Sequence, residues 1–189
     1  AGLADNGSID GYSGATALGI AALEGMNGIN SNFTWGQTFF GQIPGSIGET
    51  STFLILLAGA YMVYTKIASW RIIFGTLAGM IVMSSALNLI GSDTNPMFAI
   101  PWYWHLTIGS FAFGLVYMAT EPVSAANTNM GRWIYGISIG VIVVLIRVIN
   151  PAFPEGMMLA ILFANLLAPA IDFTITSLNT SRRMERYNS

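Results

Sequence analysis

The stretch WRIIFGTLAGMIVMSSALNLI, residues 70–90, decides the fold class of this 189-residue chain. Its only charged side chain is Arg71, close to its start. About 20 mostly apolar residues are enough for a helix to cross the ~30 Å hydrocarbon core of a bilayer. Lipid offers no partner to backbone N–H and C=O groups, so such a span has to be a helix. The stretch therefore predicts a transmembrane helix.

Four further apolar segments have a similar length, at 50–68, 102–120, 133–149 and 156–175. Charged residues make up only 8% of the chain, against about 25% in soluble domains. We therefore expect an all-α, polytopic membrane helix bundle of about five transmembrane helices over residues 49–176. A tail, 177–189, follows the last span.

Residues 1–48 precede the first span and are not uniformly polar. An apolar stretch at 16–26 predicts a short helix, and the aromatic stretch at 33–44 is too short to span. Non-helical backbone at membrane depth is tolerated only where protein buries it or a cavity is lined. We expect a short helix followed by a re-entrant or interfacial segment.

Basic residues predict the orientation of the bundle. If the five spans alternate, six of the seven basic residues fall on one side, which is then cytoplasmic. The segment 1–48 and the loops 91–101 and 150–155 face outward, and the tail is cytoplasmic. The six residues are Lys66, Arg71, Arg132, Arg182, Arg183 and Arg186.

Composition excludes several kinds of chemistry. The chain has no cysteine and one histidine, His105, which we expect to be a satisfied buried or interfacial side chain. We expect no metal site and no catalytic residue. No basic block is present, so nucleic acid is not an expected partner. If the protein does redox chemistry, a bound cofactor has to supply it.

Two carboxylates are candidates for an ion path. Asp172 lies inside the last span, and intramembrane carboxylates are costly and usually functional. Capping of a helix end, or pairing with Arg182 or Arg183, would also explain it. Glu155 precedes the last span and serves equally well as a favourable charge at a helix N-terminus. Glu49 carries the same ambiguity.

Other polar and small residues leave alternatives open. Arg147 can pair with a phosphate or with Glu155, or it can snorkel to the interface without a partner. Glycine pairs spaced as GxxxG allow close helix contact, but they also arise by chance. Phe33, Trp35, Phe39 and Phe40 can stack on a cofactor ring or pack at the interface. The glycine pairs are Gly75/Gly79 and Gly136/Gly140, and the buried polar residues expected to bond between helices are Ser84, Ser85, Asn88 and Asn165.

The loop DGYSGAT, residues 10–16, contains one further candidate. By spacing alone it is a surface turn, because the Thr16 hydroxyl is a weak nucleophile with no base nearby. The string resembles the D-x-x-[S/T]-G-A-T flavinylation motif. That resemblance implies that a dedicated transferase joins flavin mononucleotide (FMN) through its phosphate to Thr16. The motif residues Asp10, Ser13, Gly14 and Ala15 would then form the attachment site.

Nearly the whole chain resembles the B-subunit family of sodium-translocating NADH:quinone oxidoreductases. The related D subunit of the Rnf complex shares the SGAT and GETS features but less of the proline-rich stretch. The family's subunit is about twice this length, so the chain resembles its carboxy-terminal half. The other half would bring riboflavin and much of the quinone site. The matching strings are GSIGETS (45–51), IASWR (67–71), NPMFAIPWYWHL (95–106), FAFG (111–114), MATEPVSA (118–125) and LIRVINPAFPEGMMLAILFANLLAPAID (145–172).

The resemblance implies a multi-pass subunit of a bacterial inner (plasma) membrane complex that is not catalytic alone. It would carry FMN and pass electrons toward quinone, coupled to export of Na⁺. Its implied partners are the other subunits, the flavin transferase, quinone, Na⁺ and lipid. The alternatives are a passive channel or solute transporter of urea-transporter-like architecture, an Rnf-type D subunit, or a structural scaffold.

Overall fold

The computed structural model describes residues 16–46, 48–92, 94–150 and 154–188, and within these ranges it contains only helices and connecting loops. The expectation of an all-α membrane bundle is confirmed. The elements are α1 (Ala17–Asn32), α2 (Trp35–Phe40), α3 (Thr52–Tyr64), α4 (Trp70–Ile90), η1 (Pro96–Ala99), α5 (Trp102–Thr107), α6 (Phe111–Phe113), the π-helical η2 (Gly114–Met118), α7 (Asn129–Ile149) and α8 (Met157–Asn188).

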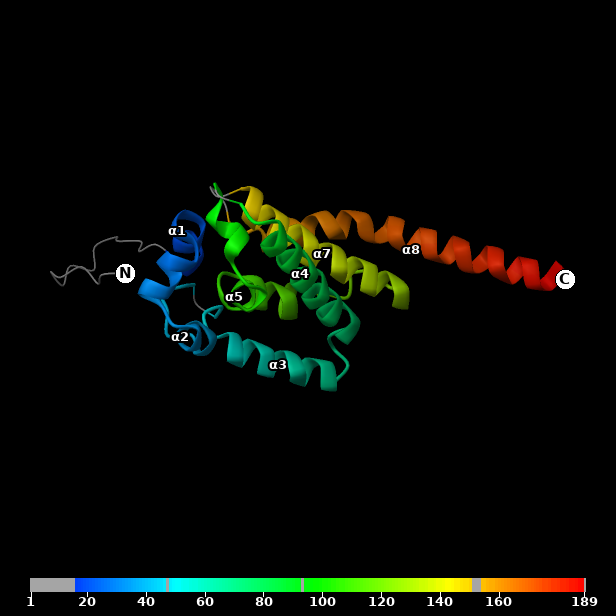
Figure 1. Cartoon of the computed structure of the whole chain (residues 1–189). Helices are drawn as coiled ribbons and strands as arrows, with labels where there is room; N and C mark the ends of the chain where they lie inside the picture. The colour runs from blue at the N-terminus through cyan, green and yellow to red at the C-terminus, as the bar shows by residue number, and fades with distance from the viewer. Residues whose placement is uncertain (1–15, 47, 93, 151–153, 189) are drawn as a thin grey trace.

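Three of the described helices, α4, α7 and α8, are long and apolar enough to cross a membrane. They coincide with the expected spans at 70–90, 133–149 and 156–175. The last of them continues well beyond residue 175, so most of the expected tail is the end of α8. These helices lie side by side in the bundle, and the end of α8 projects past its neighbours (Figure 1).

The expected span at 50–68 is shorter than predicted. Helix α3 has 13 residues, which gives it a length of about 20 Å, less than the hydrocarbon core. Ser51 caps its start by accepting a hydrogen bond from the amide of Leu54. Lys66, in the left-handed conformation with φ of 61°, ends the helical path two residues after Tyr64.

The expected span at 102–120 is not one continuous helix, and that prediction was wrong. After α5 the backbone of Ile108 is extended, and Gly109 has a φ of 69°. A positive φ is easily adopted by glycine and stops an α-helix. The chain resumes as α6 and η2, so the segment is a helix broken near its middle.

Glycines bring α4 and α7 into close contact. A β-carbon on Gly75 would lie 3.4 Å from the α-carbon of Gly136. One on Gly79 would collide with the carbonyl oxygen of Ile137 across the interface. The close-contact interpretation of the GxxxG pairs is thereby confirmed, and this helix pair forms the centre of the bundle.

The N-terminal elements cover one end of the bundle. Helix α1 is longer than the predicted 16–26 and bends at Gly25, where a β-carbon would lie 2.7 Å from the side chain of Pro96. The capping box of Thr34 and Gln37 starts α2, the short helix inside the expected re-entrant segment. The aromatic side chains of this region pack against one another in stacked, edge-to-face and tilted pairs, and contact with a cofactor ring stays a prediction; they are Trp35, Phe39, Phe40 and Phe53.

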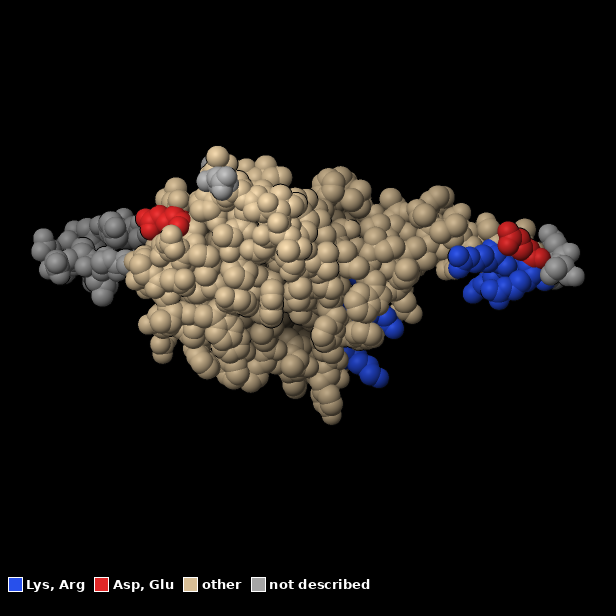
Figure 2. Space-filling view, viewed as in Figure 1, with Lys and Arg blue, Asp and Glu red and all other residues tan. Residues whose placement is uncertain are grey.

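The two ends of the bundle differ in charge. Figure 1 shows α1, α2 and η1 at one end, with the end of α3 and the starts of α4 and α7 toward the other. In the face seen in Figure 2, Lys and Arg side chains gather toward that second end, and none appears near α1 and α2. These side chains include those from which the sequence predicted the sidedness, and the sidedness itself stays a prediction.

Gly140→Ala tests the close contact of α4 and α7. The new β-carbon would collide with the carbonyl oxygen of Thr76 and lie 2.6 Å from the amide nitrogen of Met80. We expect a loss of about 1–3 kcal/mol in stability, measured as a lower midpoint of thermal unfolding in detergent. Gly36→Ala is the control, since its β-carbon would meet open space. Equal midpoints for the two variants would contradict the packing argument.

Candidate functional site

Thr16 stands at the N-terminus of α1 with an exposed side chain. Its backbone is extended, and its hydroxyl oxygen accepts a hydrogen bond from the amide of Gly19 at 3.2 Å. The free N–H groups of a first turn carry partial positive charge and favour a phosphate nearby. The hydroxyl is therefore accessible, and the helix N-terminus beside it would favour the negative charge of a phosphate ester. The other motif residues, Asp10, Ser13, Gly14 and Ala15, lie outside the described residues.

A small pocket lies next to Thr16. Its volume of about 30 Å³ holds only one or two water molecules, so a flavin ring on Thr16 would have to lie outside it. Two carboxylates, Glu49 and Glu155, reach this pocket from different parts of the chain. Its other lining residues are Ala17, Leu18, Ile43, Pro44, Gly45, Thr50, Thr107 and Gly109.

Glu155 caps the second half of the broken helix. One carboxylate oxygen accepts hydrogen bonds from the amide of Ser110 at 3.0 Å and from its hydroxyl at 2.9 Å. The sequence suggested a charge at the start of the last span. In the structure the carboxylate serves the start of α6 instead, a role that sequence spacing does not reveal.

Arg147 caps the first half of the same broken helix. Its side chain is fully buried, so the snorkelling interpretation was wrong. One terminal nitrogen donates to the carbonyl of His105 at 2.7 Å, and the other donates to the carbonyl of Ile108 at 3.0 Å. The negative end of α5 thus meets a buried cation.

Gly109 lies between these two charged groups. A β-carbon at this position would lie 2.8 Å from the Glu155 carboxylate, 3.1 Å from the Arg147 guanidinium and 2.7 Å from the Leu18 side chain. Leu18 is buried, two residues after Thr16 in α1. The helix break, its two charged caps and the start of α1 therefore form one packed unit.

Asp172 caps a different helix at the other end of the bundle. Its carboxylate accepts hydrogen bonds from the amides of Asn127 and Thr128 and from the Thr128 hydroxyl, at 2.6–3.0 Å. Thr128 is the cap of α7, so the capping alternative describes this geometry. Among the described residues, no ion pair joins Asp172 to Arg182 or Arg183.

The two ion-path candidates are not brought together. Asp172 lies about 22 Å along α8 from the start of that helix, which Glu155 precedes. No group of three His, Asp or Glu side chains within the described part of the chain is arranged to hold a metal ion. Either carboxylate would have to act separately in an ion path.

Of the remaining polar candidates, the Ser84 hydroxyl donates to the carbonyl of Ile81 in its own helix and Ser85 is exposed, so the expected bond between helices was wrong for these two. The others bond inside the bundle. His105 is buried, and its Nδ1 lies 3.5 Å from Arg147. The Tyr135 hydroxyl donates to Asn165 between α7 and α8, and the Asn88 amide donates to the carbonyl of Ile100. The sequence did not single out Ser110. Its position directly after a glycine in an apolar segment was the available signal.

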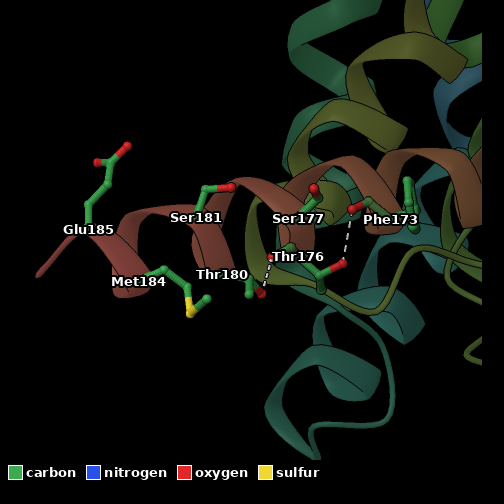
Figure 3. Close-up of a pocket in the computed structure, with 7 residues that line it drawn as sticks. All are labelled: Phe173, Thr176, Ser177, Thr180, Ser181, Met184 and Glu185. Carbon is green, nitrogen blue, oxygen red and sulfur yellow. Dashed lines mark hydrogen bonds between the residues drawn. The ribbon is translucent and has the colours of Figure 1, made fainter. Parts of the chain in front are cut away.

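A hollow along the projecting end of α8 is the open surface of a single helix, as Figure 3 shows. The Thr176 hydroxyl donates to the carbonyl of Asp172 at 2.8 Å, and the Thr180 hydroxyl donates to that of Thr176 at 2.9 Å. These polar groups are already satisfied by their own helix, so this surface is not a candidate site.

Long apolar helices and a broken helix capped by buried charge define a polytopic membrane protein of the broken-helix kind. Comparison with known proteins identifies the family. Residues 3–180 match the model of the NQR2, RnfD, RnfE family. The chain belongs to this family.

Several curated relatives are similar over nearly the whole chain. The chain is 61% identical over 180 residues to the B subunit of the Na(+)-translocating NADH-quinone reductase of Azotobacter vinelandii, and equally to that of Ectopseudomonas mendocina. It is 58% identical over 186 residues to the corresponding protein of Neisseria meningitidis. The alignments cover 95–96% of this chain but 45% of each relative. The chain thus spans about half the length of these relatives, as the resemblance implied.

Arg147→Met tests whether the buried cation holds the helix break together. The change leaves the carbonyls of His105 and Ile108 without donors in an apolar interior. Each unsatisfied acceptor costs about 1–3 kcal/mol, so we expect a marked drop in the thermal unfolding midpoint in detergent.

Arg71→Met provides the matched control, because Arg71 lies over the Trp70 ring at the first turn of α4. We expect Arg147→Lys to fall between the wild type and Arg147→Met, since one ammonium group serves fewer acceptors. If Arg147→Met were as stable as Arg71→Met, the capping role would be refuted.

Proposed function

We propose that this chain is part of the membrane-embedded B subunit of a sodium-translocating NADH:quinone reductase and carries FMN as a phosphoester on Thr16. The observation that carries the proposal is the exposed Thr16 hydroxyl at the N-terminus of α1, at the last position of the flavinylation-like motif. The family and the names of the relatives support it. The rest of the subunit would contribute riboflavin and much of the quinone site.

The residues around Thr16 suit a phosphate on one side only. The first turn of α1 offers the amide of Gly19, while Glu49 and Glu155 line the adjacent pocket. Repulsion from these carboxylates directs a phosphate away from the pocket, toward the exposed side of Thr16. Leu18, buried beside Gly109, fixes the start of α1 and hence the position of the attachment point.

A bound flavin would supply the electron transfer that the side chains of this protein do not. The protein would fix the cofactor's depth, its orientation and its distance from neighbouring redox groups. We propose that electrons reach this flavin from another subunit and pass toward quinone, coupled to Na⁺ export. The chain alone would not be catalytic, because its sequence contains no G-x-G-x-x-G motif for binding a nicotinamide dinucleotide.

The proposed location is a bacterial inner membrane, with α1 and Thr16 at the outer face. The gathering of Lys and Arg toward the opposite end supports this orientation. A transferase acting at the outer face would reach Thr16 without crossing the bundle. The end of α8 would then project on the cytoplasmic side.

A channel or solute transporter is the second candidate, and the broken helix is the feature that suggests it. Transporter folds use the free backbone ends of such helices to bind substrate. In this bundle Arg147 and Glu155 already form hydrogen bonds with the backbone carbonyls and the backbone amide that flank the break. The proposal of an electron-transfer subunit therefore fits the break better, because it needs no free backbone ends there.

Thr16→Asn tests flavin attachment separately from helix capping. Asparagine caps a helix about as well as threonine, but it offers no hydroxyl for a phosphoester. In cells with an active transferase, we expect the wild-type subunit to fluoresce on a denaturing gel and both Thr16→Asn and Thr16→Ala to be dark. Quinone reduction should be lost while assembly persists. A fluorescent Thr16→Asn band, or wild-type turnover by that variant, would rule out attachment at Thr16.

Asp172→Asn tests an ion role for this carboxylate. The amide oxygen can still accept the two hydrogen bonds from Thr128, the N-cap of α7, but the NH2 group replaces the oxygen that accepts from Asn127, and the charge is removed. If Asp172 belongs to the ion path, turnover of the assembled complex should lose sodium dependence while assembly is retained. An unchanged sodium titration would leave Asp172 with its structural role alone.

A further inference from the structure

A second pocket lies at the end of the bundle away from Thr16. The turn between α3 and α4, the loop before α7 and the first turn of α7 enclose about 190 Å³, room for several water molecules. Two cationic side chains, Lys66 and Arg132, and two hydroxyl side chains, Ser69 and Thr120, line it. The other lining residues are Ile67, Ile72, Pro122, Ala125 and Ala126.

The two cations lack a carboxylate partner at hydrogen-bond distance. No ion pair to Lys66 or Arg132 occurs among the described residues. The Nε of Arg132 donates to the carbonyl of Ala126 at 3.3 Å, which fixes the guanidinium beside the pocket. Two acidic groups at this end, Glu121 and Asp172, already accept hydrogen bonds from backbone amides of the loop before α7, although Asp172 also interacts electrostatically with Arg132.

Ser69 adds an unsatisfied polar atom to this pocket. Its hydroxyl oxygen is shielded from solvent and has no hydrogen-bond partner in the described structure. The residue caps α4 by position, yet its side chain makes no capping hydrogen bond. Buried polar groups are nearly always partnered, so this hydroxyl is available to donate a hydrogen bond to an acceptor in the pocket. An acceptor oxygen placed here would satisfy both this hydroxyl and the two cations.

We propose that this pocket binds the phosphate of an anionic lipid headgroup. The level of the pocket in the membrane supports a lipid as the source of this phosphate. Trp70 and Trp133, in the first turns of α4 and α7, meet edge to face at 5.7 Å, and tryptophan marks the level of the membrane interface. Exposed apolar side chains at the same ends of α3 and α4, Tyr64 and Phe74, offer a surface for the acyl chains.

The backbone conformation of Lys66 allows a variant that removes its charge without destabilising the fold. Its φ of 61° places it in the left-handed region, at a helix end where glycine is usual. Lys66→Gly therefore removes the charge and relieves the backbone at the same time. We expect its thermal unfolding midpoint without lipid to equal or exceed that of the wild type, so weakened binding could not be attributed to misfolding.

The experiment uses the assembled complex, stripped of lipid in detergent. Short-chain phosphatidylglycerol, short-chain phosphatidylcholine and inorganic phosphate are titrated in parallel, and binding is read by native mass spectrometry and by thermal shift. We expect Lys66→Gly and Arg132→Gln each to weaken phosphatidylglycerol binding by about fivefold, the usual contribution of one basic residue near an anionic lipid. Ser69→Ala should also weaken binding without lowering the midpoint in the absence of lipid.

Arg71→Gln is the matched control, because Arg71 lies at the same end but does not line the pocket. We expect it to change the affinity by less than about twofold, the ordinary spread for a residue outside the site. Equal loss in Arg71→Gln and the pocket variants would overturn the proposal in favour of general surface charge. Equal binding of phosphatidylcholine would also overturn it. Saturation of the pocket by inorganic phosphate with no added affinity for the lipid would show a free-anion site instead.

Discussion

The structure depends on one constraint: backbone groups exposed by a helix break in an apolar interior need partners from the protein. The break at Ile108–Ser110 creates free carbonyls at the end of α5 and a free amide at the start of α6. Arg147 supplies the donors and Glu155 supplies the acceptor. Each charge is placed at the helix end that favours it, so two side chains that are costly to bury become the caps of the break.

This arrangement also sets the position of the proposed cofactor site. Gly109 leaves just enough room for Leu18, Arg147 and Glu155 to meet. Because Leu18 is in the first turn of α1, the start of that helix is held against the break. The depth in the membrane of an attachment point on Thr16 is therefore fixed, although the Thr16 side chain is exposed. Fixed depth matters for an electron carrier, whose rate of transfer depends on its distance from its neighbours.

The sequence predicted the parts of the fold that follow from composition and spacing. It did not predict the parts that depend on contacts between residues distant in the sequence. Apolar length found α4, α7 and α8, whereas the sidedness inferred from the basic residues stays a prediction. The break at Gly109 was missed because an apolar segment with a glycine at this position looks the same whether its helix continues or stops. The partners of Arg147 and Glu155 are distant in sequence, so no local pattern reveals them. Attachment at Thr16 stays a prediction from its motif, whose first residues lie outside the described part of the chain.

The two acidic residues that looked like ion-path candidates share a mechanical role. Glu155 and Asp172 flank the apolar part of α8, and each accepts hydrogen bonds from the start of a different element, α6 or α7. Helix α8 is thus tied to its neighbours at two levels by charge-assisted hydrogen bonds, which are stronger than neutral ones. A cation that drew either carboxylate away would release a helix start. Ion binding at these residues, where it occurs, would therefore be coupled to the packing of α8, and such coupling is the kind of link that an electron-driven ion pump requires.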